Sequence, residues 1–196
     1  MFFRRNTSQV EWIAVFLGNP GLRYEDTRHN AGFITADVIA KEAGVKINRV
    51  KFNALSAVTK LGDKQVLLLK PQTYMNLSGN AVKQAMRYYK VPIDNVVVIS
   101  DDVSLPTGKL RVRRRGSSGG HNGLRDIIMK CGGEDFPRVR IGVGAPPHEE
   151  YDMADWVLSK LSGDDKELIS TAALQAAAAL EVIIKRGAEY AMAEFN

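Results

Sequence analysis

Residues 95–102 have the sequence NVVVISDD, a short apolar run that ends in two carboxylates. No polar residue alternates with the apolar ones, so we predict a strand over Asn95–Ser100 that is buried on both of its faces. Strands of this kind occur where helices pack on either side of a mostly parallel sheet. The stretch therefore favours an α/β fold.

On either side of this stretch, short β-branched or leucine-rich runs alternate with longer helical patterns. The other predicted strands are Trp12–Leu17, Ala54–Leu61, Gln65–Leu69, Lys109–Arg113 and Val139–Val143. The predicted helices are His29–Ala43, Ser78–Tyr89, Gly123–Lys130 and a segment from about Asp164 to Arg186. We expect Ser78 and Asp164 to be N-caps and Gly62-Asp63 to form a hairpin turn. Together these elements predict an α/β fold with a mixed, mostly parallel twisted sheet and helices on both faces.

The composition fits one globular domain. The chain has 196 residues, of which 45% are hydrophobic, and its net charge is +5. A disordered chain would be poorer in apolar residues, so that class is excluded. We find no repeat and no linker, and we expect a short leader, residues 1–10, followed by a single domain over residues 11–196. No apolar surface stripe calls for a second copy, so we expect a monomer.

Neither export nor a membrane is indicated. The longest apolar runs are far shorter than the ~20 residues of a membrane-spanning helix. The leader MFFRRNTSQV is polar where an export signal would be apolar. Cys131 is the only cysteine, which excludes an intrachain disulfide and a multi-cysteine metal site and favours a reducing compartment. We therefore expect a cytoplasmic protein.

Four polar, glycine-containing segments follow predicted strands. In open α/β sheets, ligands bind in the crevice outside the carboxyl ends of the strands. The segments are residues 18–33, 70–82, 100–108 and 113–123. Asparagines recur in three of them, and side-chain amides can orient a peptide group or stabilise an oxyanion without carrying charge. Asparagine also favours turns, so each amide taken alone has a simpler explanation. Four of these asparagines are Asn19, Asn30, Asn76 and Asn122.

His29 and Asp101 are candidates for proton transfer. Histidine is the usual proton carrier near neutral pH, although one at the start of a helix often only caps or packs there. A carboxylate at the end of a buried strand is costly unless it meets a cation or a hydrogen-bond donor. A carboxylate that accepts the histidine Nδ1–H fixes the tautomer and leaves Nε2 free to take a proton from water. Spacing alone does not establish that Asp101 meets His29.

Residues 116–120, GSSGG, fit the G-x-S-x-G pattern of serine hydrolases, with Ser118 as nucleophile. That elbow follows a buried apolar strand, whereas the run before these glycines is RVRRR. A serine esterase therefore remains a weaker alternative. The glycines more simply let the backbone approach a ligand or another segment.

Alternate residues of the basic run share one face of a strand, because side chains alternate across a sheet. The cations on that face are Lys109, Arg111, Arg113 and Arg115. They could simply guard a solvated edge strand against aggregation. Beside a glycine-rich loop, four such cations equally suit the phosphates of a nucleic acid, which would be bound by shape and charge.

Taken together, four segments resemble the bacterial-type peptidyl-tRNA hydrolase family, in the order of that family and over nearly the whole chain. They are GNPGLRYEDTRHNAGF (18–33), KPQTYMNLSG (70–79), VVVISDDVSLPTGKLRVRRRGSSGGHNGLRDI (96–127) and FPRVRIGVGAPP (136–147). The resemblance implies hydrolysis of the ester bond in peptidyl-tRNA or N-blocked aminoacyl-tRNA, which releases peptide and free tRNA. Neither a metal nor another cofactor is expected to be required.

The resemblance also implies roles for individual residues. His29 would be the general base, Asp101 would hold its basic form, and Asn19 would contact the peptide portion. Positions that match residues binding the tRNA end, or orienting water and carbonyl, are Tyr24, Tyr74, Asn76 and Asn122. Met75 and His121 match residues that line the crevice. Positions expected near acceptor-stem phosphates are Arg111, Arg113 and Arg140. Ser104 departs from the family, which commonly has an acidic residue there. A non-catalytic RNA-binding protein on the same fold is the alternative.

Overall fold

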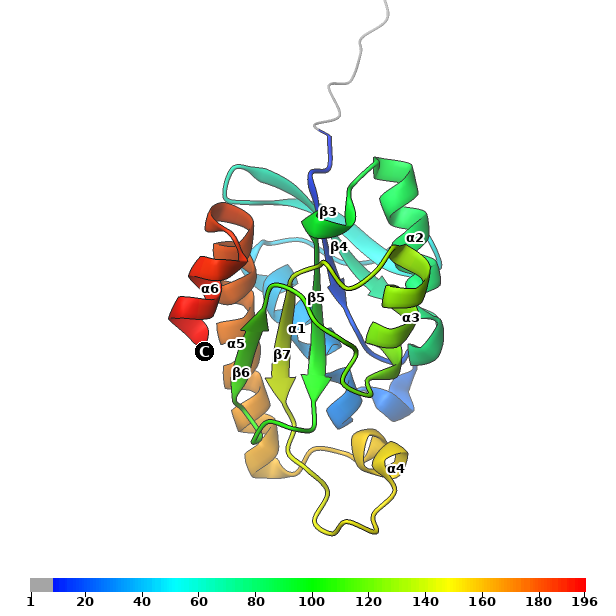
Figure 1. Ribbon diagram of the computed structural model, residues 1–196, viewed down its shortest axis with the longest axis vertical. Helices are drawn as coiled ribbons and strands as arrows, with labels where there is room; N and C mark the ends of the chain where they lie inside the picture. Colours follow the sequence, from blue (N-terminus) through cyan, green and yellow to red (C-terminus); the bar gives the residue numbers. More distant parts are fainter. Residues whose placement is uncertain (1–8) are drawn as a thin grey trace, which may run out of the picture.

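A computed structural model describes residues 9–196 as one sheet with helices on both faces (Figure 1). The strands are β1 (Trp12–Phe16), β2 (Arg49–Lys51), β3 (Ala54–Leu61), β4 (Lys64–Pro71), β5 (Val96–Asp102), β6 (Leu110–Arg113) and β7 (Arg138–Gly142). The helices are α1 (Ala31–Glu42), α2 (Ser78–Tyr89), α3 (Asn122–Cys131), α4 (Met153–Leu158), α5 (Gly163–Arg186) and α6 (Ala188–Phe195). Short 3₁₀ turns are η1 (Leu22–Tyr24), η2 (Arg28–Asn30), η3 (Met75–Leu77) and η4 (Ile93–Asn95).

The strand order is β2-β3-β4-β1-β5-β7-β6. Strands β4, β1, β5 and β7 are parallel neighbours, whereas β2-β3, β3-β4 and β7-β6 pair antiparallel. The predicted hairpin at Gly62 joins β3 to β4. The expected fold class, a mixed sheet with a parallel centre in a single α/β domain, is therefore confirmed. Of the expected leader, residues 1–8 lie outside the described residues, and Val10 is buried.

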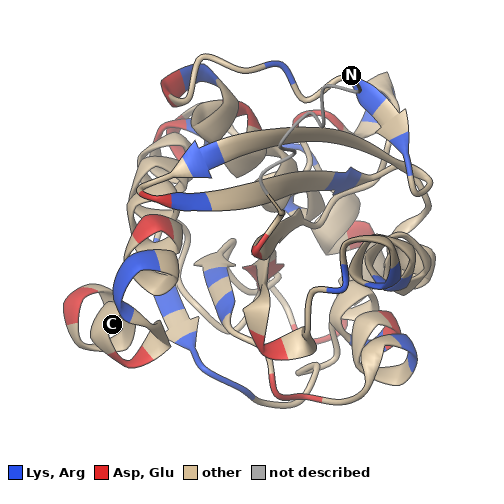
Figure 2. Cartoon of the chain, turned by 90° about the horizontal axis from the view of Figure 1, so that it is seen from above, with Lys and Arg blue, Asp and Glu red and all other residues tan. Residues whose placement is uncertain are grey.

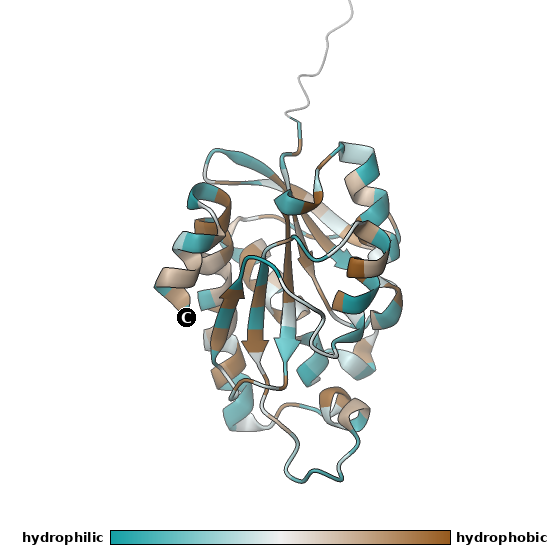
Figure 3. Cartoon of the chain, viewed as in Figure 1, coloured by the Kyte–Doolittle hydropathy of each residue, from teal (hydrophilic) through white to brown (hydrophobic). Residues whose placement is uncertain are grey.

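The core consists of two apolar layers, one on each face of the sheet. All seven residues of β5 are buried, as its unbroken apolar run predicts. One layer gathers side chains from α1, α5 and α6, and the other gathers them from α2 and α3. Figure 3 shows hydrophobic residues along the upper parts of the central strands, with hydrophilic residues toward the lower end of β5. That end is the carboxyl edge, where β5 ends in Asp101 and Asp102.

Helix α5 is long and apolar enough to cross a membrane by length and composition alone. Half of that apolar window is buried inside the protein, because α5 packs against α1 and β7. Core helices meet the same test, so packing against the sheet explains its hydropathy.

The structure differs from the predicted elements in how some helices begin and in several short elements that were not predicted. Leu77 is the N-cap of α2, and Ser162 rather than Asp164 caps α5 through its hydroxyl. The elements that sequence analysis missed are β2, α4 and α6. His29 lies in η2, one turn before α1, and the N-cap residues of η2 and α1 make no side-chain cap hydrogen bond.

Gly32 lets α1 approach the ends of β1 and β5. A Cβ atom at this position would lie 2.6 Å from Leu17 N and 2.8 Å from Ile99 O, and these backbone atoms cannot rotate away. We expect Gly32→Ala to lower the free energy of unfolding by at least ~1–3 kcal/mol, measured by chemical denaturation. Gly163→Ala is the matched control, because nothing lies within 4 Å of its added Cβ and no loss is expected. Equal stability of the two variants would contradict the close approach.

Candidate active site

The carboxyl edge of the sheet holds a pocket of about 580 Å³. Its lining comes from the ends of β1 and β5, from η2, η3 and β7, from the N-terminus of α3 with the glycine loop before it, and from α4. Of the residues proposed from the sequence, the pocket brings together Asn19, His29, Tyr74, Met75, Asn76, Asp101, His121, Asn122 and Arg140. Residues 72 positions apart in the chain thus meet at the sheet edge that topology predicts.

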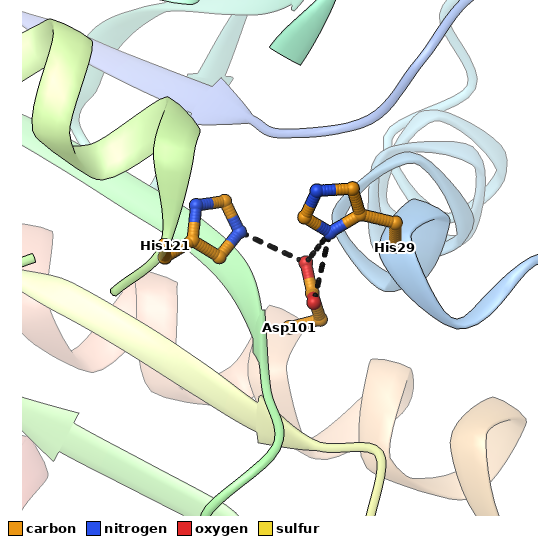
Figure 4. A group of neighbouring side chains, drawn as sticks. All are labelled: His29, Asp101 and His121. Atoms are coloured by element: carbon orange, nitrogen blue, oxygen red, sulfur yellow. Dashed lines mark hydrogen bonds and ion pairs between the residues drawn. The ribbon is translucent and has the colours of Figure 1, made fainter. Parts of the chain in front are cut away.

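His29 and Asp101 form a buried pair. The His29 Nδ1 atom lies 2.9 Å from each Asp101 carboxylate oxygen, and both side chains are almost fully buried. Figure 4 shows the second ring nitrogen, Nε2, on the side of the imidazole away from Asp101. The carboxylate thus accepts the Nδ1–H hydrogen bond and leaves Nε2 as the basic atom.

The pair shifts the pKa values of both groups. Burial alone would lower the pKa of His29, but the charge of Asp101 and its hydrogen bond outweigh burial and raise that pKa above the ordinary 6.5. Burial would raise the pKa of Asp101, yet the two neighbouring imidazoles hold it well below its usual range. Asp101 is therefore ionised at neutral pH, and its charge strengthens His29 as a base.

His121 is the second imidazole on Asp101. Its Nε2 atom lies 2.9 Å from Asp101 Oδ1 (Figure 4). Its Nδ1 atom accepts hydrogen bonds from the backbone N–H groups of Gly123 and Leu124, so the ring is the N-cap of α3. Helix capping, which the sequence offered as a simple role for His29, is thus performed by His121.

Three titratable side chains of this site, His29, Asp101 and His121, offer nitrogen or oxygen atoms within 4.8 Å of one another. The two nitrogens that face Asp101, Nδ1 of His29 and Nε2 of His121, already make hydrogen bonds to its carboxylate. The Nδ1 atom of His121 accepts two backbone N–H groups, so the proton lies on Nε2, the atom that faces Asp101. A protonated ring nitrogen has no lone pair for a cation, and the cluster is satisfied by hydrogen bonds instead.

Asn19 is held rigidly at the edge of the pocket. Its Oδ1 atom accepts the backbone N–H of Met75 at 2.9 Å. The side chain of Asn30 bonds both the N–H and the C=O of Asn19, at 2.8 and 3.0 Å. With Oδ1 engaged, the Asn19 Nδ2 group is the donor that remains for a ligand.

A second carboxylate in the pocket is neutralised. Asp102 pairs with Arg140 at 2.6 Å and also accepts hydrogen bonds from the backbone N–H and the hydroxyl of Ser104. Ser104 thus supports Asp102 rather than Asp101. Arg111 lies directly opposite Arg140 in the β6-β7 ladder.

Helix α4 supplies a wall that sequence analysis missed. It contributes Met153, Ala154, Val157 and Leu158 to the lining. Trp156 on the same helix stacks on Arg28, whose guanidinium also binds Asp165 at 2.8 Å, so α4 is fixed to the segment that carries His29. The signal in the sequence was Asp152, which caps this six-residue helix through two backbone N–H groups.

Three proposed residues lie outside the lining. Tyr24 is in η1, where Arg23 stacks on its ring, and Arg111 and Arg113 are on β6. Of the expected cationic row, Lys109 and Arg115 lie beyond the ends of the strand. Arg115 approaches Asp135 at 3.7 Å.

The geometry does not favour a serine or cysteine nucleophile. Ser118 lines the pocket from a loop, whereas a nucleophile elbow joins a strand directly to a helix. Among the described residues, the Ser118 hydroxyl makes no hydrogen bond to a histidine. Burial raises the pKa of Cys131 to about 11, which keeps its thiol protonated. A general base that activates water is the chemistry that the arrangement supports.

Comparison with known proteins agrees with the geometry. The peptidyl-tRNA hydrolase family profile matches residues 13–196. A peptidyl-tRNA hydrolase of Caldanaerobacter subterraneus subsp. tengcongensis is 48% identical over 185 residues, which cover 94% of this chain and 99% of that protein. One from a Thermoanaerobacter species is 46% identical over 185 residues, with the same two shares covered. The crystal structure of peptidyl-tRNA hydrolase from Acinetobacter baumannii matches with a TM-score of 0.89 at 33% identity, over 95% of this chain and 94% of that one. This chain therefore belongs to the peptidyl-tRNA hydrolase family.

Proposed function

We propose that this protein hydrolyses the ester that joins a peptide to the terminal ribose of tRNA, with His29 as general base. The observation that carries this proposal is the His29–Asp101 pair, which leaves the Nε2 atom of His29 free at the pocket. Pure RNA binding needs no such proton-accepting pair. The alternative of a non-catalytic RNA-binding protein is therefore not supported.

The chemical steps follow from the positions of the groups. Nε2 of His29 takes a proton from water while the oxygen of that water adds to the ester carbonyl. The side-chain amides of Asn76 and Asn122, which line the pocket, are suited to donate hydrogen bonds to the resulting oxyanion. The intermediate then expels the ribose oxygen, which receives the proton from His29. Free tRNA and the peptide acid are released, and the acid loses its proton to the solvent to become a carboxylate.

The neighbourhood of Asn19 suits a peptide rather than a free amino group. We assign its Nδ2 group to a carbonyl oxygen of the bound peptide, since Oδ1 is already engaged by Met75. The apolar wall of α4 lies across the pocket and suits peptide side chains. Recognition of N-blocked over free aminoacyl esters would follow, because only the blocked ester offers an amide carbonyl next to the ester.

We assign Tyr74, Met75 and His121 to the walls that hold the 3′ end of the tRNA and its ester. Tyr74 is 58% exposed, which leaves its ring available to stack on a base. Tyr24 lies outside the pocket, in η1, so a role in binding the tRNA end would require contact along the rim.

The β6-β7 edge suits the phosphates of the acceptor stem. Arg111 and Arg140 face each other across the ladder, so two cations lie side by side at this edge. Arg140 pairs with Asp102, whereas the described residues give Arg111 no ion pair. Acidic and basic residues are interspersed over most of the chain (Figure 2), so a local row matters more than the net charge. We assign Arg111, Arg113 and Arg140 to phosphate contacts.

Charge reversal tests this edge. We expect Arg111→Glu with Arg113→Glu to weaken tRNA binding and to reduce the slope of log K against log salt by about 1 for each phosphate that the protein no longer neutralises. A matched control reverses the charges of Lys46 and Lys60, which are exposed before β2 and on β3, on the opposite side of the sheet from β6, and should leave the slope unchanged. A slope that is the same in both double variants would place the RNA elsewhere.

One assay tests the activity itself. The protein is incubated with N-acetyl-aminoacyl-tRNA or with the unblocked aminoacyl-tRNA, and release of free tRNA is measured. The proposal predicts rapid release from the blocked ester only. Equal rates on both esters would refute the assigned specificity, and no release from either would refute the activity.

We further propose that the enzyme acts as a monomer in the cytoplasm, where its substrate is made.

A further inference from the structure

We propose that His121 is a positioning residue. The first turn of α3 fixes its ring as the Nε2–H tautomer, which donates a second hydrogen bond to Asp101. This bond sets how strongly the carboxylate of Asp101 draws a proton onto His29. This role goes beyond lining the pocket and rests on the proposed function, in which His29 is the base. The ring of His121 contacts two elements, β5 through Asp101 and the first turn of α3.

The tautomer of His121 follows from its contacts with α3. The Nδ1 atom lies 3.1 Å from Gly123 N and 3.3 Å from Leu124 N. Backbone N–H groups only donate, so Nδ1 must accept and carries no proton. The ring proton of the neutral imidazole is therefore on Nε2, which lies 2.9 Å from Asp101 Oδ1. His121 is a donor to Asp101 and does not compete with His29 as the base.

The ring has little freedom to adopt another arrangement. Its side chain is 9% exposed. The space around the first turn of α3 is so tight that a Cβ on Gly123 would lie 2.7 Å from Met75 Sδ and 3.2 Å from His121 Cε1. Turning the ring over would place a carbon atom toward the two backbone N–H groups and break the cap. The position of α3 thus fixes the direction of the Nε2–H group.

Asp101 consequently has two imidazole donors, and both approach the same oxygen. His29 and His121 each lie 2.9 Å from Oδ1, and their ring centroids are 5.0 Å apart. A hydrogen bond to a carboxylate stabilises its charged form and makes it a weaker proton acceptor. The bond from His121 therefore moderates the pull of Asp101 on His29.

The other ionisable side chains that line the pocket do not cancel the negative charge of Asp101. Asp102 and Arg140 neutralise each other at 2.6 Å, and the remaining ionisable side chain of the lining is the phenol of Tyr74. The residues that η3 and α4 contribute to the lining are uncharged. A change in the His121–Asp101 bond should therefore be felt chiefly by His29.

Two substitutions separate the two contacts of His121. In His121→Asn the amide is close to the position of Nδ1, so its oxygen can still cap α3, but the side chain is too short to reach Asp101. In His121→Gln the amide reaches the position of Nε2 and can donate to Asp101, but the cap is lost. The first variant removes the proposed interaction, and the second retains it at the expense of helix stability.

The test is the pH dependence of kcat/KM for the N-blocked ester. We expect His121→Asn to shift the ionisation on the acid side of the pH profile upward by ~0.5–1 pH unit. This shift lowers kcat/KM at pH 6.5 by roughly 3- to 10-fold, and the rate is restored at alkaline pH. We expect His121→Gln to keep the limb of the unsubstituted protein while its Tm falls. The proposal would be overturned if all three proteins showed the same ionisation, if the fall in kcat/KM were independent of pH, or if both variants lost the ionisation.

Nuclear magnetic resonance gives a readout without substrate. At pH 8 the ¹⁵N shifts of His121 should report a protonated Nε2 and an unprotonated Nδ1, and titration of His29 should move upward only in His121→Asn. A protonated Nδ1 on His121, or identical titration of His29 in the three proteins, would overturn the proposal. Because these spectra need no turnover, they distinguish its failure from a failure of the proposed hydrolysis.

Discussion

Replacing His29 by alanine is expected to lower kcat for release of tRNA from N-acetyl-aminoacyl-tRNA by at least ~100-fold, the low end for loss of a positioned acid–base group. The reason is geometric. His29 presents its Nε2 atom to the pocket, and Asp101 fixes the tautomer from the other side of the ring. The described residues place no other base in the lining with a free ring nitrogen, since both nitrogens of His121 are engaged.

His148→Ala is the matched control for this variant. His148 is exposed in the loop before α4 and lies outside the pocket, so its removal should leave kcat unchanged. Thermal unfolding of both variants shows whether a loss of rate reflects loss of the fold. Near-normal hydrolysis by a folded His29→Ala protein would remove His29 from the mechanism.

The second large effect is expected for Asp101→Asn. The asparagine keeps the size of the side chain and can accept the Nε2–H of His121, but its NH₂ group would donate to His29 Nδ1. That bond favours the wrong tautomer, with the lone pair of His29 turned away from water, and it removes the charge that strengthens the base. We expect kcat to fall by about 10³- to 10⁴-fold, as measured by single-turnover hydrolysis.

The neighbouring carboxylate provides the comparison for this change. Asp102→Asn alters a group that pairs with Arg140 and does not touch either imidazole, so we expect it to lower kcat by less than ~10-fold. If the two substitutions cost the same, the charge of the pocket as a whole would matter more than the contact of Asp101 with His29.

The centre of the fold could be predicted from the sequence because its signals are local and strong. The apolar run of β5 is buried at every position, and the predicted bounds of β3 and α2 agree with the structure. The helix caps were less predictable. Several polar residues near the start of α5 could cap it, and only the backbone path shows that Ser162 does.

The missed elements owe their structure to their neighbours. Strand β2 has three residues, with Val50 largely exposed, and forms by pairing with β3. Helix α6 follows α5 after Gly187, whose φ of 99° ends α5 at Arg186, where the sequence predicted its end. It packs on α5 and β6, where the side chain of Asn196 bonds both backbone groups of Val112.

The sequence predicted which segments line the candidate site better than it predicted the contacts between their side chains. The segments after β1, β4 and β5 meet at one edge because parallel strands share their carboxyl ends. The glycine loop follows the antiparallel strand β6 and reaches the same pocket by running back to α3. The sequence could not establish that Asp101 reaches His29, nor that His121 rather than His29 caps a helix. Those contacts depend on the packing of α3 against η3, which no local pattern encodes.

The pH dependence of kcat/KM for N-acetyl-aminoacyl-tRNA tests the central claim most directly. Because Asp101 raises the pKa of His29 above 6.5, His29 stays protonated to a higher pH than a free imidazole, and the base is available only above that pKa. We predict one ionisation on the acid side with an inflection above pH 6.5, and no such limb in the residual rate of His29→Ala. An inflection below pH 6.5 would contradict the effect of Asp101 on the pKa of His29, and the same inflection in the variant would contradict the assignment of His29 as the base.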